Sequence, residues 1–151
     1  MRKAYELLIQ TGNALQPLFL LAVRLFWGWH FFTAGWGKFH NVESTVSFFT
    51  ELQIPFPLLS VYLAAFSECV GGLCLLIGFA SRLAALPLIF TMVVALLTAH
   101  RKEVLAIFED PTPLISESAF TYLCAALLIF VFGPGALSID ALIKRYIVKS
   151  K

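Results

Sequence analysis

The chain has 151 residues, of which 60% are hydrophobic and only 13% charged, and its formal net charge is +2 at neutral pH. This composition excludes an ordinary soluble domain, and residues 1–151 are of a length that suits a single domain. The few basic residues are spread over predicted loops and chain ends and form no patch. The sequence therefore gives no indication of nucleic-acid binding.

The first apolar run extends from about residue 15 to residue 37 and contains one fully charged side chain, Arg24. It is too long for the core of a signal peptide and lacks a small-x-small cleavage site. The run therefore predicts a membrane-spanning helix that stays in the protein. Further along, Val46, Phe49 and Leu52 fall on one helical face, which indicates a short interfacial helix before the next span.

Three more runs predict membrane-spanning helices at about residues 57–80, 83–99 and 114–132. The last of them stops at Gly133-Pro134-Gly135, a strong helix-breaking cluster. The stretch at about residues 138–149 gathers apolar side chains on one face, which is typical of an amphipathic helix lying on a membrane. The predicted fold is an all-α membrane protein, namely a four-transmembrane-helix bundle with short interfacial helices.

The distribution of lysine and arginine predicts the orientation in the membrane. One side would hold Arg2, Lys3, Arg82, Lys144, Arg145, Lys149 and Lys151. The other side would hold only three basic residues, Lys38, Arg101 and Lys102, and it would also hold most of the acidic residues. By the positive-inside rule, both termini are expected in the cytoplasm.

Two charges fall deep inside predicted spans. Counted from the expected span ends, Arg24 lies roughly 14 Å from the cytoplasmic edge and Glu68 roughly 16 Å from the outer edge of a core about 30 Å thick. Lone charges at that depth cost roughly 2.5–3.5 kcal/mol on insertion scales, so we predict an ion pair between Arg24 and Glu68. The pair could serve a ligand or only fix the register of the two helices.

We expect the outer half of the bundle to hold a small apolar ligand, with a quinone as the first candidate. The expected pocket combines buried charge with aromatic rings and consists of Arg24, His30, Phe31, Lys38 and Glu68. Close helix packing is expected at the glycines Gly28, Gly35, Gly71, Gly72 and Gly78. The alternative is a dry, tightly packed bundle.

Other chemistries find less support in the sequence. No Cys-x-x-Cys pair is present, so no dithiol redox centre is expected. Two of His30, His40 and His100 could ligate a haem on the outer side, but haem is disfavoured because nothing fixes a pairing. No metal-ligand pair, phosphate-binding loop or nucleophile motif occurs, so no metal is expected and no catalytic residue is assigned.

Three stretches, RLFWGWHFFTAGWGK, ECVGGLCLLIGFASRLAAL and FGPGALSID, resemble the DoxX family of small bacterial membrane proteins with four helices. The resemblance covers about residues 21–140. By this resemblance, the recurring family positions here are Arg24, Gly28, Gly35, Lys38, Glu68, Gly72, Gly78 and Arg82. The resemblance implies a bacterial inner-membrane location and association with thiosulfate:quinone oxidoreductase subunits or with membrane complexes that handle oxidative stress.

Three functional classes stay open at this point. The first, favoured by the resemblance, is a quinone-linked subunit of a redox complex whose soluble or membrane partner does the chemistry. The second is a non-catalytic membrane scaffold or assembly factor. The third is a small transporter, which the lack of a second set of buried charges disfavours. The oligomeric state is left open.

Overall fold

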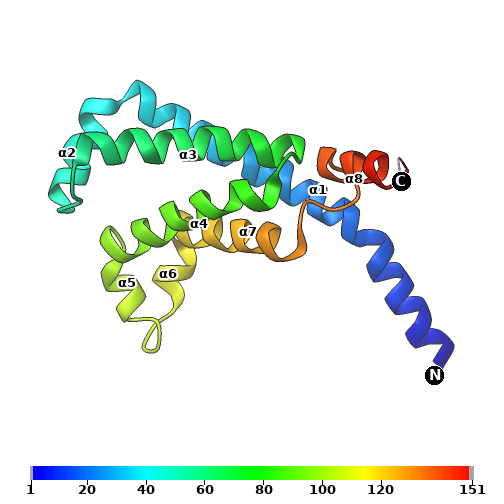
Figure 1. The fold of residues 1–151 in the computed structure, drawn as a ribbon. Helices are drawn as coiled ribbons and strands as arrows, with labels where there is room; N and C mark the ends of the chain where they lie inside the picture. Colours follow the sequence, from blue (N-terminus) through cyan, green and yellow to red (C-terminus); the bar gives the residue numbers. More distant parts are fainter. Residues whose placement is uncertain (1, 150–151) are drawn as a thin grey trace.

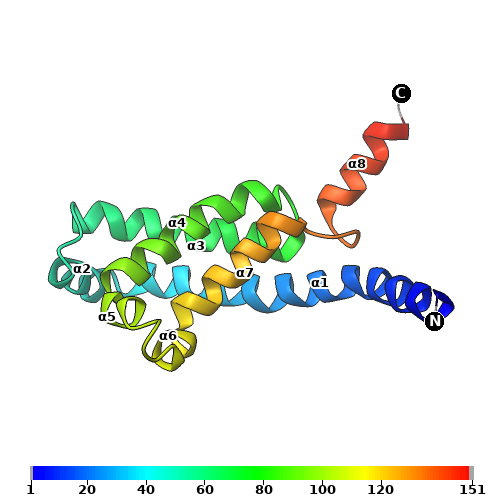
Figure 2. The same cartoon turned by 90° about the horizontal axis from the view of Figure 1, so that it is seen from below.

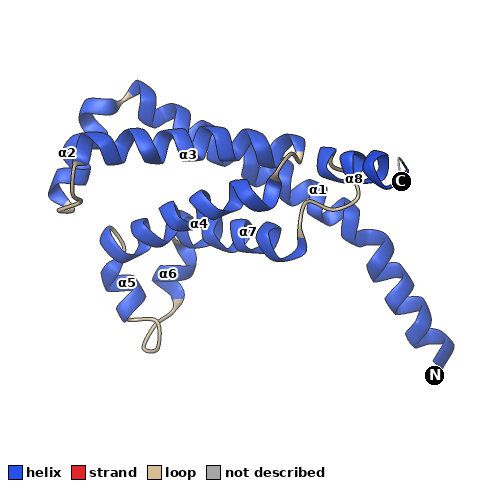
Figure 3. Ribbon diagram, in the orientation of Figure 1, coloured by secondary structure: helices blue, strands red, loops and turns tan. Residues whose placement is uncertain are grey.

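The computed structural model describes residues 2–149, and their regular secondary structure is entirely helical (Figure 3). This confirms the predicted all-α class. In chain order the helices are α1 (Arg2–His40), α2 (Val42–Glu51), α3 (Pro57–Ile77), α4 (Ser81–Thr98), α5 (Arg101–Leu105), α6 (Thr112–Ser116), α7 (Ser118–Phe132) and α8 (Ile139–Lys149). Lys151, which the orientation prediction counts, lies outside the described residues.

Within residues 2–149, helices α1, α3 and α4 are long and apolar enough to cross a membrane, and α7 is a shorter apolar helix of 15 residues. The predicted fourth span is interrupted at Glu117, whose extended backbone separates α6 from α7. At 1.5 Å per residue α7 is about 22 Å long, less than a hydrocarbon core of about 30 Å. A membrane crossing by α7 therefore stays a prediction.

The apolar helices pack as two antiparallel pairs. Helix α1 lies against α3 and α4 lies against α7, and the two views show α4 and α7 side by side (Figures 1 and 2). Between α3 and α4, Gly71 lies against Leu88. The buried apolar side chains of this core include Phe31, Leu75, Leu88, Met92 and Ile129.

Close contact between α1 and α3 depends on glycine. A Cβ added at Gly35 would lie 2.6 Å from the Ala65 carbonyl oxygen, and one at Gly72 would lie 2.5 Å from the Phe32 nitrogen. Real Cβ atoms do not approach backbone so closely, so these helices touch only because both positions lack a side chain. The contacts also set the register, because Gly28 faces Gly72 and Gly35 faces Ala65.

The turn between α3 and α4 is closed by the start of α8. Helix α3 ends at Gly78, whose φ of +72° lies in the left-handed region that glycine adopts readily. The Asp140 carboxylate accepts hydrogen bonds from the backbone N–H groups of Ala80 (2.7 Å) and Ser81 (3.0 Å). The Asp140 N–H donates to the Gly78 carbonyl at 2.9 Å. These bonds tie the α8 start to the α3–α4 turn.

Helix α1 is longer than the predicted first span. It begins at Arg2 and has 39 residues, so its first turns project beyond the other apolar helices (Figure 1). Helix α8 points away from the bundle at the same end (Figure 2). Helices α2 and α8 lie where the interfacial helix and the amphipathic helix are expected, and their contact with a membrane stays a prediction.

Candidate functional site

A cavity of about 640 Å³ lies between the two helix pairs. Helices α3 and α4 meet at their shared turn and separate toward the other end of the molecule, where α2 lies (Figure 1). The cavity occupies this wider part, and α1, α2 and α7 supply its remaining walls. Its apolar lining includes Phe31, Phe49, Leu63, Ala64, Phe90 and Ala95.

One ion pair faces this apolar space. Lys38 Nζ and Glu68 Oε2 lie 2.5 Å apart, and both residues line the cavity. The Glu68 side chain is only 2% exposed, whereas the Lys38 side chain is 25% exposed. Helical side chains tilt toward their own N-terminus, so in the antiparallel pair α1 and α3 these two stems converge. A buried carboxylate thus receives its charged partner from the neighbouring helix.

This geometry corrects the expected ion pair between Arg24 and Glu68. The Arg24 side chain lies beside Gly78, and Glu68 is ten residues before Gly78 on α3, about 15 Å along the axis. The Arg24 stem also tilts away from Glu68, toward the start of α1. Its Nη2 donates instead to the Leu137 carbonyl at 2.5 Å. The sequence estimate measured both depths from expected span ends, and α1 begins well before residue 15.

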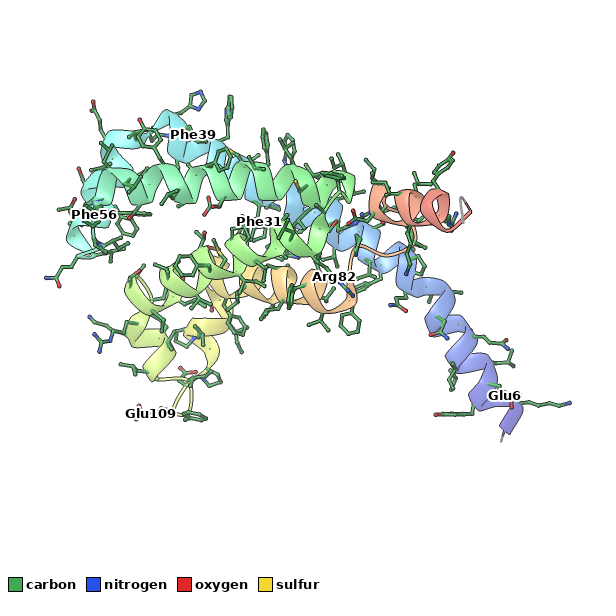
Figure 4. All side chains as sticks on the ribbon, viewed as in Figure 1. Glu6, Phe31, Phe39, Phe56, Arg82 and Glu109 are labelled. Carbon is green, nitrogen blue, oxygen red and sulfur yellow. The ribbon has the colours of Figure 1, made fainter. Side chains whose placement is uncertain are left out.

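The other expected pocket residues divide between two environments. Phe31 is fully buried, lines the cavity and packs edge-on against Tyr122 with ring centroids 4.7 Å apart. Figure 4 shows Phe31 between α3 and α4. His30 is not part of the lining and packs against Phe26 with centroids 4.5 Å apart. The cavity thus brings together Phe31, Lys38 and Glu68, and it leaves out Arg24 and His30.

Several lining residues were not anticipated from the sequence. Tyr122 of α7 and Ser67 of α3, which carry hydroxyl groups, belong to the lining. His100 also lines it, and its Nδ1 lies 3.2 Å from Glu117 Oε2. In the sequence, Tyr122 is a polar residue within an apolar run and His100 is one at the end of such a run. This pattern does not indicate which neighbouring helix either side chain faces.

The described residues offer little for a metal or a haem. Within residues 2–149, no three His, Cys, Asp or Glu side chains gather where they could hold a metal ion. Of the three histidines, only His100 lines the cavity, while the exposed His40 ring packs near Trp36. The cavity instead suits an amphipathic molecule, with an apolar body along the walls and a polar head at Lys38 and Glu68.

Apolar helices of membrane-spanning length around a cavity of this kind define a helical multi-pass membrane protein. The sequence model of the DoxX family matches residues 19–101, more than half of the chain. A protein of Escherichia coli (strain K12) named "Inner membrane protein YqjF" is 34% identical over 135 residues, which covers 87% of this chain and 96% of that protein. The chain belongs to the DoxX family, which confirms the resemblance stated from its motifs.

Two further relatives extend the comparison. "Inner membrane protein YphA" of Escherichia coli (strain K12) is 27% identical over 129 residues, covering 85% of this chain and 92% of that protein. "Putative oxidoreductase CatD" of Bacillus subtilis (strain 168) is 28% identical over 103 residues, covering 68% of this chain and 69% of that protein. No solved structure matches the chain.

Proposed function

We propose that this protein is the quinone-binding membrane subunit of a redox complex, with the cavity between α3 and α4 as the binding site. A soluble or membrane partner subunit would carry out the chemistry, because no catalytic motif occurs in this sequence. The name of the relative CatD is consistent with redox work in the family. The alternatives of a scaffold and of a transporter predict no stoichiometric binding of quinone.

The single observation that carries this proposal is the Lys38–Glu68 pair facing an apolar cavity. A volume of about 640 Å³ lies within the range of small-molecule sites, which are mostly apolar with a few convergent polar groups. The Lys38 ammonium can donate to a quinone carbonyl, and the Glu68 carboxylate can accept from a quinol hydroxyl. The rings of Phe31 and Tyr122 offer aromatic contact to the head group.

The cavity also offers a path for an apolar tail. Leu63 of α3 and Phe90 of α4 line it, and both side chains keep a largely exposed apolar surface. In a bilayer this surface faces lipid. A quinone could therefore enter sideways from the membrane and leave its tail among acyl chains.

A benzoquinone with a decyl tail should stabilise the purified full-length protein against thermal unfolding. At a hundred times its dissociation constant, the gain is about 2.7 kcal/mol. Ala95→Phe, which fills part of the cavity, should reduce this gain, because Ala95 lines the wall. The matched control Ala22→Phe adds the same ring to an exposed position of α1 outside the lining and should leave the gain unchanged.

The unfolding temperature, measured with and without the quinone, checks this expectation, and chemical extraction counts any quinone that copurifies. An unchanged unfolding temperature in the wild type, together with far less than one extracted quinone per chain, would reject the proposal and favour the scaffold. Equal losses in Ala95→Phe and Ala22→Phe would place the quinone outside this cavity.

We also propose that the protein resides in a bacterial inner membrane with both termini in the cytoplasm. Arg82 lies at the end where the termini lie, and so does α8, which carries Lys144 and Arg145, while Glu109 lies at the other end (Figures 1 and 4). A green fluorescent protein fused after Lys151 should fluoresce, and alkaline phosphatase at the same position should be inactive. Active phosphatase at that position would overturn this orientation.

A further inference from the structure

A second cavity, of about 580 Å³, lies at the end of the molecule where both termini are found. It is formed by the start of α4, the end of α7 and the start of α8. Two cations, Arg82 and Lys144, line it together with one acid, Asp140. The Gly133-Pro134-Gly135 segment supplies backbone to the same wall. Neither the proposed quinone site nor the Lys38–Glu68 pair extends to this place.

The acid in this cavity does not neutralise its two cations. Both Asp140 carboxylate oxygens accept backbone hydrogen bonds from the α4 start, and the charge of Asp140 also acts on the buried Arg24. Among residues 2–149, no carboxylate forms an ion pair with Arg82 or Lys144. The cavity therefore has an excess of positive charge.

Arg82 is held in place by the backbone. Its Nη2 donates to the Val131 carbonyl at 3.2 Å, and its guanidinium covers Gly133 so closely that an added Cβ would lie 3.3 Å from Nε. Figure 4 shows Arg82 at the end of the bundle, beside the end of α7. Its remaining N–H groups stay available to an anion, since a guanidinium has five donors.

Apolar side chains adjoin these cations. Leu83 and Phe132 line the same cavity and are 70% and 59% exposed, respectively. On α8, the apolar side chains of Leu142 and Tyr146 are exposed as well. A free phosphate would gain nothing from such surfaces, whereas a phospholipid has acyl chains to cover them. Basic pockets beside membrane helices at the interface are typical sites for anionic lipid head groups.

We propose that this cavity binds the phosphate of an anionic phospholipid, with Arg82 and Lys144 as its ligands and acyl chains along Leu83 and Phe132. Binding would join the ends of α4 and α7 to α8 and so hold α8 at the membrane surface. The site needs no quinone and no partner subunit, so it stands independently of the proposed function.

The test uses full-length protein in nanodiscs of phosphatidylcholine to which phosphatidylglycerol is added, with native mass spectrometry counting bound lipids after release. Wild type should retain phosphatidylglycerol in preference to phosphatidylcholine. Lys144→Gln should weaken this retention about fivefold, the usual effect of one interfacial cation. The exposed Lys144 side chain has no hydrogen bond or ion pair with residues 2–149, so its replacement should not disturb folding.

Arg145→Gln is the matched control, because it removes one charge from the neighbouring position of α8 and lies outside the cavity lining. It should leave the retention unchanged. Equal weakening by Lys144→Gln and Arg145→Gln would mean a general attraction between α8 and the membrane and would overturn the site. Displacement of phosphatidylglycerol by millimolar inorganic phosphate, or equal retention of both lipids, would overturn it as well.

Discussion

Replacing Lys38 with methionine is expected to lower the free energy of unfolding by about 3–5 kcal/mol, by analogy with buried ion pairs in soluble proteins. Replacing Glu68 with glutamine should cost less. The Glu68 side chain is 2% exposed and cannot reach solvent once Lys38 is gone, whereas Lys38 is 25% exposed and can extend its long stem toward the interface. Reversible unfolding in mixed micelles measures both losses. An equal or larger loss in Glu68→Gln would contradict this account of the pair.

A double-mutant cycle tests the pairing itself. Lys38→Met combined with Glu68→Gln should cost clearly less than the sum of the single losses, because the residues are in contact. Arg24→Met combined with Glu68→Gln is the comparison cycle, and its losses should add within about 0.3–0.5 kcal/mol, as expected for distant sites. Coupling in the Arg24 cycle and none in the Lys38 cycle would restore the pair inferred from membrane depth.

The contrast between these two cycles shows what the sequence can and cannot provide. Apolar runs and breakers locate helices, because burial in lipid requires continuous helical segments. The sequence therefore predicted α3 and α4 closely, and it placed the end of α7 at Gly133. Register between helices is different, since it is set by backbone contacts such as Gly35 with Ala65 that only the packed structure reveals.

The lining of the cavity also shows that the sequence does not reveal how the helices are arranged relative to one another. Phe31, Lys38 and Glu68 could be chosen because they combine charge and aromatic rings on α1 and α3. The opposite walls could not, because a four-helix pattern does not say which helices are neighbours. The place of Tyr122 and Phe90 in the cavity lining follows only from the structure, in which α4 and α7 form a second pair that diverges from the first.

The start of α1 was missed for a further reason. The first span was predicted from residue 15 because continuous hydrophobicity begins there, whereas the preceding residues 5–14 mix leucine and isoleucine with polar side chains. In the structure they continue the same helix, which carries α1 beyond the bundle. The depth of Arg24 was counted from residue 15, which is not the start of the helix. This error placed Arg24 too close to the middle of the membrane.

Gly78→Ala is expected to destabilise the protein by about 2.5–5 kcal/mol. The left-handed backbone at Gly78 (φ +72°) accounts for about 1–2 kcal/mol of this, because a Cβ disfavours that conformation. A Cβ here would also collide with Arg24 Nη1 and lie 2.7 Å from Ser138 Cβ. The Arg24 guanidinium is 1% exposed and hydrogen-bonded to Leu137, so displacing it adds about 1.5–3 kcal/mol.

Reversible unfolding of Gly78→Ala is best compared with Gly37→Ala, because an added Cβ at Gly37 meets nothing within 4 Å and the position is helical. Gly37→Ala should stabilise α1 by up to about 1 kcal/mol. The collision with Arg24 is separated from the backbone effect by repeating Gly78→Ala in an Arg24→Met background, where a flexible, uncharged side chain can move aside. There the loss should shrink to the backbone part, about 1–2 kcal/mol, together with the effect of the Ser138 contact. If Gly78→Ala costs as much stability in the Arg24→Met background as in the wild type, Arg24 does not contact Gly78. That result would contradict the packing of α1, the α3–α4 turn and α8 described above.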